Sequence, residues 1–194
     1  MPKQKKVKTG KKVNFLIIPE QDAQGKVPEP YLLLKEVRDL HHGDTKMARI
    51  AMAWRLRTKA DKDGHIVLGK CVKVSDLYRE YADYDFIIVL NKDFWEDPQV
   101  TKAQRVALID HECCHAAPVI NEETGDHEVD ERGRYLFRTR DHDVMEFIEI
   151  VQRNGIWKHD LAAFAKVLAE KRKAPMFAVD PSAQTAAQDA TSIQ

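Results

Sequence analysis

Cysteine and long apolar runs are scarce in this chain of 194 residues. Only three cysteines occur, Cys71, Cys113 and Cys114, and an odd number with two adjacent members argues against a disulfide framework and for a reducing compartment. The longest apolar runs, such as residues 86–90, have about five residues, whereas a membrane-spanning helix needs about 20. No apolar stretch typical of a signal peptide follows the N-terminal lysines. We therefore expect a cytoplasmic protein without a membrane segment.

Net charge is also absent, because 31 Lys and Arg residues balance 31 Asp and Glu residues. A neutral chain has no general attraction to nucleic acid, and 43% hydrophobic residues are enough to build a core. Residues 1–12 are rich in lysine and predict a solvated basic tail, with weak contact to nucleic acid as the alternative. Residues 174–194 are rich in Ala, Gln, Ser and Thr and predict a second tail. One domain is expected between them, over residues 13–173.

Strand and helix patterns are mixed along this domain. Five segments have the patterns of strands: residues 13–18, 48–57, 66–74, 85–90 and 134–139. Four segments have helical spacing: residues 30–40, 101–117, 141–154 and 160–173. A turn at residues 61–64 predicts that 66–74 forms a hairpin with 48–57. The combination predicts an α+β fold, in which a small mixed or antiparallel sheet is packed with helices.

Residues 111–115 read His-Glu-Cys-Cys-His and match the H-E-x-x-H motif. Four residues along a helix turn the chain by about 400°, so His111 and His115 lie about 40° apart, one turn above the other. Two imidazoles placed in this way can bind one tetrahedral zinc ion (Zn2+). Glu112 lies about 100° round from His111, where it can reach a water on the ion and act as general base. The motif therefore predicts a zinc site for hydrolysis by metal-activated water.

A catalytic zinc site needs a third protein ligand, and several residues compete for this role. His142 is the favoured candidate and Glu146 is the alternative third ligand. The two are four residues apart on one face of the predicted helix, so one could bind the ion while the other supports it. The acidic segment offers weaker options in His127, Glu128 and Asp130, although a solvated charge run is the simpler interpretation.

The residues around the motif have simpler interpretations. Cys113 falls on the side of the helix away from the histidines and is expected to be a small buried hydrophobe. Cys114 lies about 60° from His111, so a thiolate ligand that closes a structural site is an alternative. His42 and Asp110 are expected to be exposed polar residues.

Three stretches of this chain, residues 85–96, 104–115 and 140–147, closely resemble the phage metallopeptidases, small zincin-like proteins encoded by phages and prophages. The resemblance covers roughly residues 30–160, and its more distinguishing element is His-Asp-Val-x-Glu-Phe at residues 142–147. It implies a minimal zincin-like fold in which His111 and His115 bind zinc, Glu112 is the general base and His142 is the third ligand. Cys113 departs mildly from the family, which usually has an apolar residue there.

These observations predict a zinc-dependent metallopeptidase that hydrolyses a protein or peptide, encoded by a phage or prophage and located in the host cytoplasm. Arg134, Tyr135 and His127 are all candidates for stabilising the oxyanion, and spacing does not select among them. One alternative is a non-catalytic zinc-stabilised binding or regulatory module. The other is a DNA-associated accessory protein that acts through the lysine-rich tail.

Overall fold

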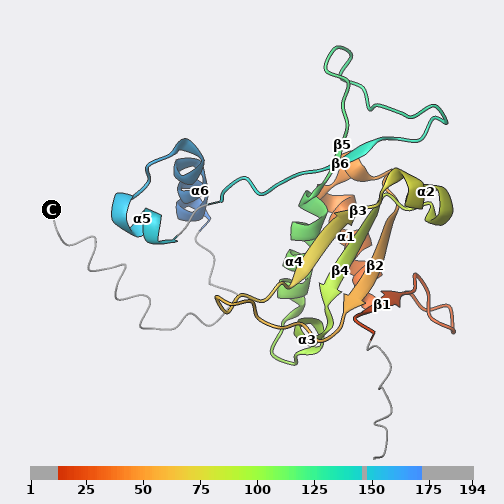
Figure 1. Cartoon of the computed structure of the whole chain (residues 1–194), viewed down its shortest axis with the longest axis horizontal. Coiled ribbons are helices and arrows are strands. Elements are labelled where there is room, and N and C mark those ends of the chain that lie inside the picture. The colour runs from red at the N-terminus through yellow and green to blue at the C-terminus, as the bar shows by residue number, and fades with distance from the viewer. Residues whose placement is uncertain (1–12, 146–147, 172–194) are drawn as a thin grey trace, which may run out of the picture. The chain divides into compact units, whose positions relative to one another are not determined.

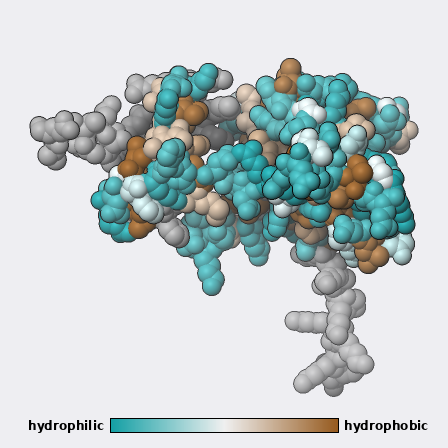
Figure 2. All heavy atoms as spheres, turned by 90° about the horizontal axis from the view of Figure 1, so that it is seen from above, coloured by the Kyte–Doolittle hydropathy of each residue, from teal (hydrophilic) through white to brown (hydrophobic). Residues whose placement is uncertain are grey.

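The computed structural model describes residues 13–145 and 148–171. The chain divides into two compact units, Met1–Arg140 and Asp141–Gln194 (Figure 1). The predicted tails at 1–12 and 174–194, and the alternative ligand Glu146, lie outside the described residues. The predicted limits of the domain therefore stay a prediction. The face drawn in Figure 2 is largely hydrophilic, with apolar side chains in scattered patches.

The first unit contains a four-stranded mixed sheet, as the α+β prediction requires. Its strands are β1 (Phe15–Ile18), β2 (Ile50–Arg55), β3 (Gly69–Lys73) and β4 (Phe86–Asn91), in the spatial order β1-β2-β4-β3. The central pair β2 and β4 is parallel, whereas β1 pairs with β2 and β3 pairs with β4 in antiparallel fashion. The edge strand β3 is therefore held on one side only by β4.

The predicted hairpin between residues 48–57 and 66–74 is wrong. The turn at residues 61–64 does form, since the Gly64 N–H donates to the Asp61 carbonyl at 3.3 Å, but β3 pairs with β4 instead of β2. The reason is the continuous apolar run of β4, whose Phe86, Ile88 and Leu90 are all 0% exposed. Such a strand is most stable with neighbours on both edges, and it therefore lies between β2 and β3.

Two helices cover one face of this sheet, namely α1 (Glu29–His41) and α4 (Lys102–Cys114). Apolar side chains of both helices pack into one core with the inward side chains of β2 and β4. The buried members include Leu33, Val37, Ile109, Cys113, Met52 and Ile88. Two short helices, α2 (Asp76–Ala82) and α3 (Lys92–Glu96), and the 3-10 turn Gly43–Thr45 were not predicted.

The start of α4 is as predicted, and its end is earlier. The Thr101 hydroxyl accepts from the Gln104 N–H and the Gln104 side chain accepts from the Thr101 N–H, which is the expected capping box. The helix ends at Cys114, and not near residue 117, because residues Ala116–Pro118 form the strand β5. This strand pairs antiparallel with β6 (Phe137–Thr139) and draws the chain out of the helix.

The second unit contains α5 (Ile148–Asn154) and α6 (His159–Glu170). The predicted helix over 141–154 is wrong in its first part, since residues 141–145 are not helical. The predicted stop is confirmed, because Gly155 takes a left-handed φ of 64° directly after α5. None of the helices in the described ranges is long and apolar enough to cross a bilayer.

Candidate metal centre

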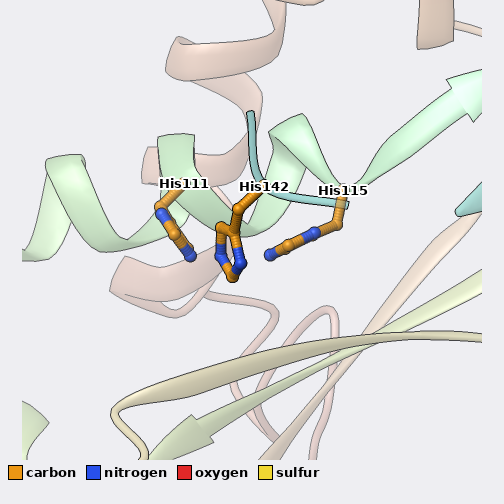
Figure 3. A group of neighbouring side chains, drawn as sticks. All are labelled: His111, His115 and His142. Carbon is orange, nitrogen blue, oxygen red and sulfur yellow. The ribbon is translucent and has the colours of Figure 1, made fainter. Parts of the chain in front are cut away.

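Three histidine side chains converge beside the last turn of α4. His111 lies in that turn and His115 follows it at the C-cap, with 5.2 Å between the centroids of their rings. The ring of His142 projects into the same space (Figure 3). One ring nitrogen from each of the three lies within 4.8 Å of the others, so the group could hold a metal ion. The structure thus brings together the three residues that were predicted as ligands, and their binding of zinc stays a prediction.

His142 arrives at this place through strand register. In the ladder of β5 and β6, Ala116 faces Thr139, so the next pair is His115 and Arg140. The Arg140 N–H donates to the His115 carbonyl at 2.8 Å, and His142 follows two residues later. A paired backbone therefore replaces the helical face that the sequence predicted for His142.

The His115 ring is oriented by the same pairing. Its Nδ1 lies 2.7 Å from the Arg140 carbonyl oxygen. A carbonyl oxygen can only accept a hydrogen bond, so Nδ1 must carry the proton. In the neutral ring the lone pair then lies on Nε2, the nitrogen that remains for a metal. A backbone carbonyl that orients a histidine in this way is a common second partner at metal sites.

The Glu112 side chain is buried, with only 2% of its surface exposed. The Cys71 N–H of β3 donates to its carboxylate. The second oxygen of this carboxylate, Oε2, is buried and has no hydrogen-bond partner among the described residues. Burial raises the pKa of the Glu112 carboxyl, while the charge of His115 and the Cys71 N–H act in the other direction. A buried carboxylate with one unsatisfied oxygen can readily accept a proton there.

The strand β3 approaches Glu112 closely at a glycine. The N–H of Val74 donates to Asp85 and the N–H of Asn91 donates to Leu68, which places the even-numbered residues of β3 in the hydrogen-bonded pairs with β4. Gly69 and Cys71 therefore turn their backbone groups to the open edge. A Cβ added at Gly69 would lie 2.3 Å from Oε1 of Glu112, so a larger residue cannot fit there without displacing the carboxylate. Sequence reasoning missed this residue, although a glycine within a strand can signal such an approach.

The two cysteines of the motif have different surroundings. Cys113 is 1% exposed and belongs to the core, which confirms the prediction of a small buried hydrophobe. The donor atom of Cys114 is grouped with those of His42 and Asp110. The expectation of an exposed His42 is wrong, since it is 8% exposed and its Nε2 lies 2.7 Å from Oδ1 of Asp110. The C-terminal end of α1 packs near α4, and this contact buries the ring.

The acidic segment does not contribute to the three-histidine group. Among the described residues, the groups of three or more donors include neither His127, Glu128 nor Asp130. Asp130 accepts instead from Arg134, through its backbone N–H at 2.9 Å and through Nε at 2.7 Å, and these bonds lower the pKa of Asp130 to about 2. Arg134 also pairs with Glu80 at 2.7 Å, so its guanidinium is engaged in two ion pairs.

A comparison with protein families decides the assignment. The family model described as "Putative phage metallopeptidase" matches residues 27–178, well over half of the chain. The chain belongs to this family. Membership of this family indicates that the protein is a metal-dependent peptidase, with a protein or peptide as its substrate. Searches of curated proteins and of solved structures found no match.

The donors of this metallopeptidase fit the metal ion that the family implies. Three imidazoles converge, the search of the described ranges adds no fourth donor to their group, and one of them is oriented by a backbone carbonyl. Three protein ligands with an open position are typical of catalytic zinc sites. The unsatisfied oxygen of Glu112 lies on the neighbouring face of the same helix.

Proposed function

We propose that this protein is a zinc-dependent peptidase in which His111, His115 and His142 hold the ion and Glu112 is the general base. The observation that carries the proposal is the convergence of three imidazole nitrogens next to a buried carboxylate with one unsatisfied oxygen. From the family description we also propose that the chain is encoded by a phage or prophage and acts in the host cytoplasm.

Each residue then has a defined task. Zinc bound here supplies a Lewis acid that polarises the scissile carbonyl and lowers the pKa of a water. Glu112 takes the proton of the attacking water on Oε2, the oxygen without a partner, and delivers it to the leaving amine. The Cys71 N–H donates to the same carboxylate and helps to keep its direction while the proton is transferred. The Arg140 carbonyl keeps the His115 ring in the tautomer that presents Nε2.

Substitution of the base tests the mechanism. Glu112→Gln is expected to keep its bound zinc and to lower the cleavage of a generic protein substrate about 10²–10⁴-fold, the usual contribution of a general base. Glu131→Gln is the matched control, because Glu131 is exposed and belongs to none of the donor groups. Cleavage that persists in Glu112→Gln would remove the mechanism.

Metal analysis of two further variants tests the third ligand. His142→Ala is expected to lower the zinc content of the purified protein, and Glu146→Ala is expected to keep it. A loss of zinc in Glu146→Ala alone would show that Glu146, and not His142, is the third ligand. Unchanged zinc in both variants would contradict a third ligand from this segment.

The two alternative functions receive no support from the described residues. A closed structural site would need Cys114 beside the three histidines, but its donor atom is grouped with His42 and Asp110. The lysine-rich residues 1–12 lie outside the described part of the chain, and the family match carries no indication of nucleic acid.

A further inference from the structure

We propose that His42, Asp110 and Cys114 form a second metal site, separate from the three histidines, for a borderline or soft divalent cation such as zinc. One donor atom from each residue lies within 4.8 Å of the other two. All three residues belong to the first compact unit, and they come from two elements that pack together, α1 and α4.

The two donor groups are distinct because they use different faces of α4. Asp110 and Cys114 are four residues apart, as are His111 and His115, so each pair lies on one face of the helix, one turn apart. Each residue of the first pair precedes its counterpart by one position, which rotates it by about 100° around the helix axis. The first pair therefore meets His42 at the end of α1, and the second pair meets His142.

The chemistry of the group selects the class of cation. Imidazole, carboxylate and thiolate are the three protein ligands of zinc, and a thiolate disfavours magnesium and calcium. On coordination the Cys114 thiol releases its proton to solvent. With metal–ligand bonds of about 2.0–2.1 Å, a nitrogen and an oxygen on a tetrahedral ion lie about 3.3 Å apart. The His42–Asp110 pair, now at 2.7 Å, opens by roughly half an ångström, which rotation of the partly exposed Asp110 side chain allows.

An ion at this place would fasten the C-terminal end of α1 to the last turn of α4. His42 is the C-cap residue of α1 and is 8% exposed, so its ring is already fixed by the packing around it. Asp110 and Cys114 flank the turn that carries His111 and Glu112. The second ion is therefore assigned a structural role, in which it holds the turn of the first site.

Cobalt binding to the full-length, metal-free chain tests this site. Co2+ bound by a thiolate has a near-ultraviolet charge-transfer band, and the three-histidine group contains no sulfur. We expect two equivalents of Co2+ to bind, of which only one contributes to the thiolate band. In Cys114→Ser the band is expected to vanish and one equivalent to remain. His42→Ala and Asp110→Asn are expected to weaken the Co2+ that gives rise to the band.

Matched variants separate the two sites. Cys71→Ser and Cys113→Ala are expected to keep the band, because these thiols belong to no donor group among the described residues. The double variant His111→Ala/His115→Ala is expected to lose the other equivalent and to keep the band. A band that persists in Cys114→Ser, that disappears in the double histidine variant, or that never forms in the unmodified chain would overturn the second site. None of these outcomes depends on peptidase activity.

Discussion

The two sides of α4 differ in how their functional groups are held. The buried side carries Glu112 and Cys113, at 2% and 1% exposure, against the sheet. The open side carries Asp110, His111 and Cys114, whose partners come from other parts of the chain. Residues that are neighbours in the sequence therefore depend on different structures. Packing against β3 determines the position of the base, whereas strand register and the end of α1 determine which donors meet on the open side.

Thiol reactivity is the largest expected contrast between the two sides. Burial raises the pKa of Cys71 and Cys113 to about 12 each. The thiolate is the form that reacts with an alkylating agent, so both residues are expected to react slowly near neutral pH. With chelator present, iodoacetamide is expected to modify the exposed Cys114 much faster than Cys71 or Cys113, as measured by mass spectrometry over time. The thiolate fraction at Cys71 and Cys113 rises tenfold per pH unit up to about pH 12.

Denaturant provides the control for this measurement. All three cysteines are expected to react at similar rates in the unfolded chain, and native Cys114→Ser is expected to remain unmodified. Rapid modification of Cys113 in the native protein would contradict its place in the core.

A methyl group on β3 tests the buried side. Gly69→Ala forces Oε1 of Glu112 to move, because the added Cβ would lie 2.3 Å away. We expect cleavage to fall about 100-fold, as for a displacement of about 1 Å at a reacting group, with unchanged zinc content. The free energy of unfolding is expected to fall by about 1–3 kcal/mol through overpacking.

A double-mutant cycle shows whether Glu112 is the cause. In the Glu112→Ala background the added methyl group meets no carboxylate, so Gly69→Ala is expected to leave the free energy of unfolding nearly unchanged. Gly43→Ala is the matched control, since no atom lies within 4 Å of its added Cβ. An equal cost of Gly69→Ala in both backgrounds would show that the strand, and not the carboxylate, requires glycine.

A proline on the open side tests the strand register. Arg140→Pro removes the N–H that donates to the His115 carbonyl, while the extended residue before it suits a proline. We expect zinc affinity to fall about 10–100-fold, the usual cost of losing an outer partner of a ligand, as measured by competition with a chelator. Arg140→Ala keeps the backbone N–H and carbonyl, so its zinc affinity is expected to fall much less. A similar loss in both variants would assign the effect to the arginine side chain.

Local patterns in the sequence predicted most of the elements. The strands β1, β2 and β4 and the helices α1, α4 and α6 all begin and end within three residues of the predicted positions, because apolar periodicity and the Thr101–Gln104 capping box are local signals. The predicted partner of β3 was wrong. The turn before β3 indicated a hairpin with β2, but the buried strand β4 needs a neighbour on each edge and pairs with β3. The short helices α2 and α3 carry too few residues to show a helical period.

The candidate site divides in the same way. The spacing of His111 and His115 is a property of one helix, and the sequence alone therefore predicted that they lie on one face. The donor atom of His142 lies near those of His111 and His115, and its role as a ligand stays a prediction. The sequence wrongly placed it on a helix, because its position follows from the pairing of β5 with β6. The sequence did not show that Gly69 and His42 lie against the motif, since each approaches α4 from a distant part of the chain.

The sequence by itself determined that two imidazoles and a carboxylate lie on adjacent faces of one capped helix, because residue spacing within a helix needs no distant contact. Only the tertiary structure decided which face is buried and which strand lies against Glu112. It also decided which remote histidine lies beside each pair of donors on the exposed side of α4. Those choices depend on strand order and register, and they are made by packing between segments that no local pattern connects.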